Sequence, residues 1–238
     1  MKVFSIAIKE LKYFFKTPVA YIVLTVTMGI LNTLFYLIIE ENKEATLRDL
    51  FQTIEFIFIF IIPLITMRSF AEEKASGTLE FLLTTPTPAA TLVLGKYLGS
   101  LVILCSLIAV VPVYYCLIGN FAHIDALATW VGFGGIFLEG AFFMALGLLT
   151  SSFSRSPVSA AILSYAIFFF LYFAMSFSSY VPNQEAQNFL KAISTFSHLE
   201  NFAVGVVRFS DIAYYLSGIF ACLYLLPYHI DSRLLNRI

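Results

Sequence analysis

Residues 67–98 read MRSFAEEKASGTLEFLLTTPTPAATLVLGKYL, the longest charge-bearing segment between strongly apolar runs of the chain. The runs on either side are nearly uncharged, whereas this stretch carries Arg68, Glu72, Glu73, Lys74, Glu80 and Lys96. A polar insert between two membrane spans must lie in water, because lipid cannot satisfy its polar groups. We therefore expect this stretch to lie outside the bilayer and to define what the protein does.

A short amphipathic helix is predicted within this stretch, over residues 71–84. Its leucines cluster and its charged side chains remain available to solvent, which is typical of a helix that rests on another surface. Pro86 ends the helix, because proline disfavours a helical residue before it. Thr87 and Pro88 then predict the start of a second helix that runs into the next span.

The composition indicates an all-α membrane protein with several spans. Hydrophobic residues make up 60% of the 238 residues and charged residues only 12%, whereas a soluble domain has about 25% charged residues. No basic patch with interleaved aromatic residues is present, so nucleic-acid binding has no support. The cysteines lie in apolar runs without metal-site spacing, which predicts neither a metal site nor a disulfide framework: Cys105, Cys116 and Cys222.

Six apolar runs are each long enough to cross a bilayer, which takes about 20 residues in a helix. We expect residues 1–238 to form a single transmembrane domain, with spans over residues 18–39, 50–67, 99–118, 127–150, 157–177 and 212–230.

Two further segments have the pattern of helices that do not cross. Residues 2–16 predict an amphipathic helix with its lysines on one side, and Ile6 and Glu10 lie off that pattern. Such a helix lies in the membrane interface. Residues 178–210 are too polar to span and too apolar for a free loop, which predicts one or two short helices that enter the membrane in part.

The distribution of Lys and Arg predicts that both termini are cytoplasmic. In that orientation ten of the 14 basic residues lie on the inner side and four on the outer side, as the positive-inside rule requires. The four outer residues are Lys43, Arg48, Lys191 and Arg208. The same orientation places residues 67–98 in the cytoplasm.

No motif for catalysis or nucleotide binding occurs in the chain: G-x-x-x-x-G-K-[ST], H-E-x-x-H and G-x-S-x-G are all absent. We therefore expect no catalytic residue, metal or cofactor on this chain. Two carboxylates lie within predicted spans, Glu55 and Glu139, where a charge costs a few kcal/mol and usually faces a cavity or a partner. They could form a polar path wall or a site for a cation, or a protonated or hydrogen-bonded contact between helices.

The chain resembles the ABC-2-type transporter permeases, and more narrowly the gliding-motility-associated permease subgroup. The resemblance covers nearly the whole chain and is clearest in residues 67–73, 77–84, 94–96 and 151–157. It implies that residues 2–16 form an elbow helix and that residues 71–84 form the coupling helix, which docks on an ATPase. The ATPase-coupling residues would be Glu72, Glu73, Gly77, Thr78, Leu79, Glu80, Phe81, Leu82, Leu83 and Thr84.

The resemblance also implies an outer-gate region of short re-entrant helices, with His198, Asn201, Phe202, Gly205 and Asp211. It further implies a transporter in the bacterial cytoplasmic (inner) membrane that exports or extracts cargo. Two ABC ATPase subunits would bind ATP and Mg, and an identical or related second permease would complete the path within membrane lipid.

Two other classes of function remain open from the sequence. One is a membrane enzyme acting on lipid through Glu55, Glu139, His123 or His198, which would keep its activity without an ATPase. The other is a membrane scaffold or a secondary carrier. Carriers often have repeated halves, and no convincing repeat is found here.

Overall fold

The computed structural model describes residues 2–42, 47–78, 88–120 and 124–235. Within these ranges all the regular structure is α-helical, as the composition predicts. Six helical stretches are long and apolar enough to cross a membrane, which confirms the predicted number: Pro18–Glu40, Arg48–Ala75, Ala89–Gly119, Ala126–Phe153, Pro157–Ser178 and Phe209–Ile230.

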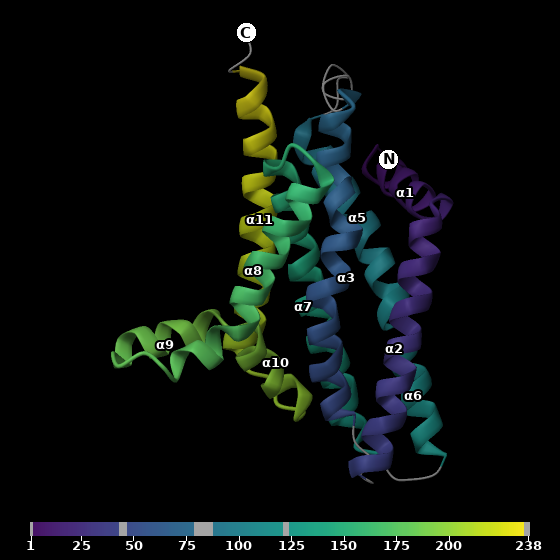
Figure 1. Cartoon of the computed structure of the whole chain (residues 1–238), viewed down its shortest axis with the longest axis vertical. Helices are drawn as coiled ribbons and strands as arrows, with labels where there is room; N and C mark the ends of the chain where they lie inside the picture. Colours follow the sequence, from purple (N-terminus) through teal and green to yellow (C-terminus); the bar gives the residue numbers. More distant parts are fainter. Residues whose placement is uncertain (1, 43–46, 79–87, 121–123, 236–238) are drawn as a thin grey trace.

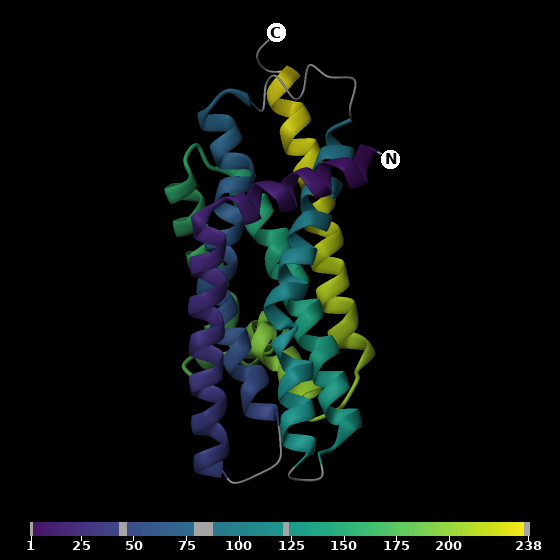
Figure 2. The ribbon, with the colours of Figure 1, turned by 90° about the vertical axis from the view of Figure 1, so that its right-hand side faces the viewer.

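The long helices run side by side along one axis (Figure 1): α2 (Pro18–Asn42), α3 (Arg48–Ala75), α5 (Ala89–Ile108), α7 (Ala126–Phe153), α8 (Pro157–Ser178) and α11 (Phe209–Leu235). Helix α7 is central, because it packs against α3, α5, α8, α10 and α11. Helix α1 (Lys2–Lys16) lies across one end of this bundle (Figure 2), which we call the α1 end. The C-terminal end of α11 lies at the same end, as an even number of crossings requires.

Helix α3 is longer than the sequence predicts. It continues to Ala75 instead of ending at residue 67, so residues 71–75 are its last turns and not the start of a separate helix. Its end is capped, because the Ser76 amide donates to the Glu72 carbonyl at 3.0 Å. Gly77 follows with φ at +71°, a left-handed conformation that favours glycine at the end of a helix. The remainder of the predicted coupling helix, residues 79–84, lies outside the described residues.

The third span consists of two helices. Helix α5 begins at Ala89, and Pro88 precedes it in an extended conformation. Helix α6 (Val110–Gly119) continues the span after Ala109. Pro112, in the first turn of α6, has no amide hydrogen to donate to the preceding turn, and a proline of this kind is a usual cause of such a break.

Side-chain caps account for the starts of α7 and α8. The Asp125 carboxylate accepts from the Leu127 and Ala128 amides at 3.0 and 3.2 Å. Ser156 and Ser159 form a reciprocal capping box around Pro157.

The region over residues 178–210 contains two short helices, α9 (Gln184–Ile193) and α10 (Thr195–Ala203). Helix α9 projects sideways from the bundle (Figure 1). Helix α10 packs against α3, α7 and α8.

Helix α1 packs closely on α5 because two glycines, four residues apart, leave room for it. A Cβ atom on Gly95 would lie 2.6 Å from the Ile6 Cβ, and one on Gly99 would lie 3.0 Å from the Glu10 Cβ. Small residues at this spacing allow helices in membranes to approach each other closely. The glycine pair therefore positions α1, and with it Glu10, against α5.

We expect Gly95→Ala to destabilise the protein by about 1–3 kcal/mol, because the added methyl group has no space against Ile6. Gly29→Ala is the matched control on α2, where a Cβ would have nothing within 4 Å. That change should be neutral or stabilising by up to about 1 kcal/mol, since alanine favours helix more than glycine. Thermal unfolding in detergent, followed by circular dichroism, measures both. Equal effects of the two substitutions would contradict the close α1–α5 contact.

Candidate functional site

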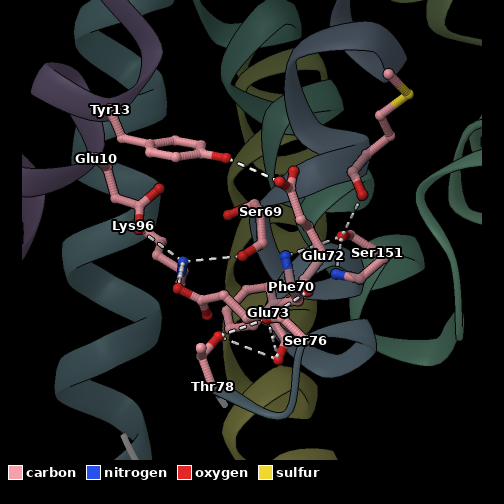
Figure 3. Close-up of polar contacts among 12 residues, drawn as sticks. Glu10, Tyr13, Ser69, Phe70, Glu72, Glu73, Ser76, Thr78, Lys96 and Ser151 are labelled. Atoms are coloured by element: carbon pink, nitrogen blue, oxygen red, sulfur yellow. Dashed lines mark hydrogen bonds and ion pairs between the residues drawn. The ribbon is translucent and has the colours of Figure 1, made fainter. Parts of the chain in front are cut away.

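A buried lysine joins three helices at the α1 end. The Lys96 ammonium on α5 donates to Glu10 of α1 at 2.7 Å, and to the Glu73 carboxylate and the Ser69 carbonyl of α3, both at 2.9 Å (Figure 3). The Lys96 side chain is only 1% exposed. A lysine ammonium has three N–H donors, so each donor has an acceptor.

This arrangement compensates a charge that would otherwise be costly to bury. An unpaired buried ion carries a penalty of several kcal/mol, and good geometry to opposite charges offsets it. Lys96 has two carboxylates as partners, and its Nζ atom also lies 5.1 Å from the centre of the Phe70 ring. Removal of the lysine alone would leave two carboxylates facing each other.

Two further contacts tie the end of α3 to its neighbours. The Tyr13 hydroxyl of α1 donates to Glu72 at 2.9 Å. Partial burial and this bond to a carboxylate raise the pKa of Tyr13. The Ser151 hydroxyl of α7 accepts from the Phe70 and Ala71 amides, both at 3.1 Å, and donates to the Met67 carbonyl at 3.1 Å. The last turns of α3 are therefore bonded to α1, α5 and α7 (Figure 3).

Those predicted coupling residues that the structure describes lie in this cluster. Glu72 and Glu73 make the contacts above, Gly77 follows the cap of α3, and the Thr78 hydroxyl donates to the Glu73 carbonyl at 3.3 Å. The other six lie outside the described residues: Leu79, Glu80, Phe81, Leu82, Leu83 and Thr84.

Three members of this cluster were not predicted from the sequence: Glu10, Lys96 and Ser151. Two signals could have found the first two. Glu10 lies off the lysine face of its helix, and Lys96 is the single charge between the apolar residues that follow Pro88. Ser151 carries no such signal, because serine in a membrane helix usually bonds its own backbone.

The two intramembrane carboxylates, which the sequence places 84 residues apart, are brought together between α3 and α7. Glu55 and Glu139 are both 0% exposed and lie near each other, and neither oxygen of the Glu139 carboxyl group has a hydrogen-bond partner among the described residues. The Thr195 hydroxyl of α10 donates to Glu55 at 3.1 Å. Neither side chain reaches an open surface in this conformation, and the bond between Thr195 and Glu55 joins α10 to α3.

A third polar cluster lies where α9, α10 and α11 meet. Asp211 at the start of α11 accepts from the Asn201 amide at 3.0 Å, and its Oδ1 lies 2.7 Å from the His198 Nδ1. The His198 Nε2 lies 3.0 Å from the Ala192 carbonyl oxygen. Three of the predicted outer-gate residues therefore hold these helices together.

The other predicted outer-gate residues have different environments. Phe202 is 3% exposed and packs against α7, where a Cβ on Gly135 would lie 2.5 Å from the Phe202 Cβ. Gly205 follows α10 with φ at +80°. His123 lies outside the described residues.

No group of three or more His, Cys, Asp and Glu side chains that could hold a metal ion occurs among the described residues.

Comparison with known proteins identifies a family. The model of the ABC-2 family transporter proteins matches residues 5–228, which is most of the chain. No curated protein is significantly similar to the chain.

We expect Lys96→Met to lower the free energy of unfolding by about 3–5 kcal/mol, because it leaves Glu10 and Glu73 without their cation. Lys12→Met, an exposed change on α1, should lie within about 0.5 kcal/mol of wild type. Thermal unfolding in detergent measures both.

The triple variant Lys96→Met, Glu10→Gln, Glu73→Gln should recover much of the loss, because it removes all three charges together. A Lys96→Met protein as stable as Lys12→Met would refute the role of the buried lysine.

We expect Glu139→Gln to be as stable as wild type or more stable, because the amide keeps the shape and adds an N–H donor toward Glu55. Glu139→Ala should lose about 2 kcal/mol or more, because it leaves a void beside a buried carboxyl group. Comparison of the two unfolding midpoints checks this. An alanine variant as stable as wild type would contradict a helix-contact role and favour a path wall.

Proposed function

The chain belongs to the ABC-2 family of transporter proteins, which makes it a membrane permease subunit of an ABC transporter, and we propose that a separate ATPase drives it through residues 71–84. In this proposal Glu72, Glu73, Gly77 and Thr78 carry the motion into the bundle, while the segment with Leu79, Glu80, Phe81, Leu82, Leu83 and Thr84 contacts the partner. ATP and Mg are bound by the ATPase.

The observation that carries the proposal is the bonding of the α3 end to three helices. A force on the residues after Ser76 would act on α3 directly. It would also act on α5 through Lys96, on α1 through Tyr13 and on α7 through Ser151. Coupling between distant sites travels through packed and bonded elements of this kind.

The distribution of basic residues supports the orientation that this coupling needs. Both termini and the α1 end then face the cytoplasm, and α1 acts as the elbow helix in the interface. Helices α9 and α10 form the re-entrant region at the outer mouth, where His198, Asn201, Phe202, Gly205 and Asp211 line the outer gate.

The proposed assembly contains two permeases, identical or related, and two ATPases in a bacterial cytoplasmic membrane. Six candidate spans per chain are few to enclose a wide path, and two copies would supply twelve. Closure of the ATPases would tilt the spans and drive export or extraction of cargo. The resemblance further suggests the gliding-motility-associated subgroup of permeases.

We expect the double variant Leu82→Asp, Leu83→Asp to abolish co-purification with the ATPase, because buried apolar anchors usually carry most of the energy of an interface. The measurement is pull-down of an affinity-tagged permease from membranes in which a candidate ABC ATPase from the same genome is co-expressed. The bound fraction should fall by at least about a hundredfold, which corresponds to about 2.7 kcal/mol.

The matched control is Val206→Asp, Val207→Asp, an adjacent pair of exposed aliphatic residues between α10 and α11. It should leave ATPase binding unchanged. Retained binding in the leucine variant would remove the docking assignment, and loss of binding in both would indicate a general defect.

A further inference from the structure

A cavity of about 520 Å³ lies at the α1 end, between α1, the start of α2, α3 and α5. One part of its lining is polar and is formed where α1 crosses α3 and α5: Lys9, Glu10, Arg68, Glu72, Glu73 and Lys96. The other part is apolar: Val19, Leu64, Ile65, Ile103 and Leu148.

The polar and apolar parts lie at different depths. Leu64 precedes Arg68 by four residues on α3, and Ile103 follows Lys96 by seven residues on α5. At 1.5 Å per residue, Leu64 and Ile103 lie about 6–10 Å farther from the α1 end than these two cations. The cavity therefore fits an amphiphile with its polar group beside α1 and its apolar part toward the middle of the bundle.

The lining carries three carboxylates as well as three cations, and a phosphate would be held by the two cations that have no ion-pair partner among the described residues. Glu10 and Glu73 are bonded to Lys96, and Glu72 accepts from Tyr13. Lys9 and Arg68 also line the cavity, and within the described ranges neither forms an ion pair with an acidic side chain. Arginine and lysine together form a common phosphate site, because both donate charge-assisted hydrogen bonds.

We propose that this cavity binds one glycerophospholipid, with its phosphate between Lys9 and Arg68 and an acyl chain along Leu64, Ile65 and Ile103. An amphipathic helix such as α1 lies at the depth of the headgroups, so a lipid of the same leaflet has its phosphate at the right level. A lipid in this site would join α1 to α3. Among the described residues, the only side-chain hydrogen bond between these two helices runs from Tyr13 to Glu72. Binding of lipid at this site depends on the membrane and not on the ATPase.

The test uses the full chain, purified in mild detergent from membranes that contain phosphatidylethanolamine and phosphatidylglycerol. Native mass spectrometry and lipid phosphorus should give about one retained phospholipid per chain. The double variant Lys9→Gln, Arg68→Gln should reduce this occupancy about tenfold, because both phosphate contacts are lost. The matched control, Lys12→Gln, Arg155→Gln, removes two exposed basic residues that do not line the cavity and should retain the lipid.

A second measurement locates the lipid. The protein is placed in nanodiscs of the same two lipids with a trace of phosphatidylethanolamine that carries a diazirine on its acyl chain. Crosslinks should concentrate in peptides containing Leu64, Ile65 and Ile103. Ile65→Trp keeps both cations and fills the apolar part, so it should remove the Ile103 crosslink even if the double charge variant does not fold.

Equal lipid retention in the two double variants would overturn the proposal. Detergent as the only retained amphiphile, or crosslinks spread evenly over the lipid-facing helices, would also overturn it. The readouts are lipid occupancy and position, so they are independent of ATPase binding. A failure of the docking experiment therefore leaves this site intact, and a failure here leaves the transport assignment intact.

Discussion

The burial of one ammonium group constrains the whole α1 end of the molecule. Lys96 is almost fully enclosed, and in a low-dielectric environment its charge requires acceptors in good geometry. Those acceptors come from α1 and α3, not from its own helix. The positions of three helices are thus coupled by a single group, and the glycines at positions 95 and 99 provide the close contact that brings Glu10 within reach.

The other polar clusters follow the same physical rule at different depths. Glu55 and Thr195 join α3 to α10 within the span region, while Asp211 joins α10 and α11 through Asn201 and His198. In lipid, apolar contact between helices has little hydrophobic driving force, so packing and polar contacts determine which helices associate. Helix α3 takes part in the connections at Lys96 and at Glu55, and α7 is bonded to α3 through Ser151.

The features that depend on a local sequence pattern, such as the number of spans, could be predicted from the sequence. Six apolar runs correspond to six candidate spans. The end of α3 was predicted too early, because charges mark the limit of an apolar run whereas a helix continues as long as its backbone bonds and a cap permit. The contact of Glu10 with Lys96 joins residues 86 positions apart. Neither periodicity nor composition contains that pairing, although Glu10 lies off the lysine face of its helix.

The same geometry explains why this end of the bundle suits a moving part. Helix α3 extends to Ala75, and its last turns are held by the buried side chain of Phe70 and by side-chain bonds to three helices. Bonds of this kind are directional, so a displacement of α3 either carries the partner helices along or breaks the bonds at a cost set by the buried charge. If α5 moved away from α1 and α3, Glu10 and Glu73 would face each other without the Lys96 cation. This cost strongly favours joint movement of the three helices. The end of α3 is therefore mechanically continuous with α1 and α5, whereas α2, the least buried span, can follow them more loosely.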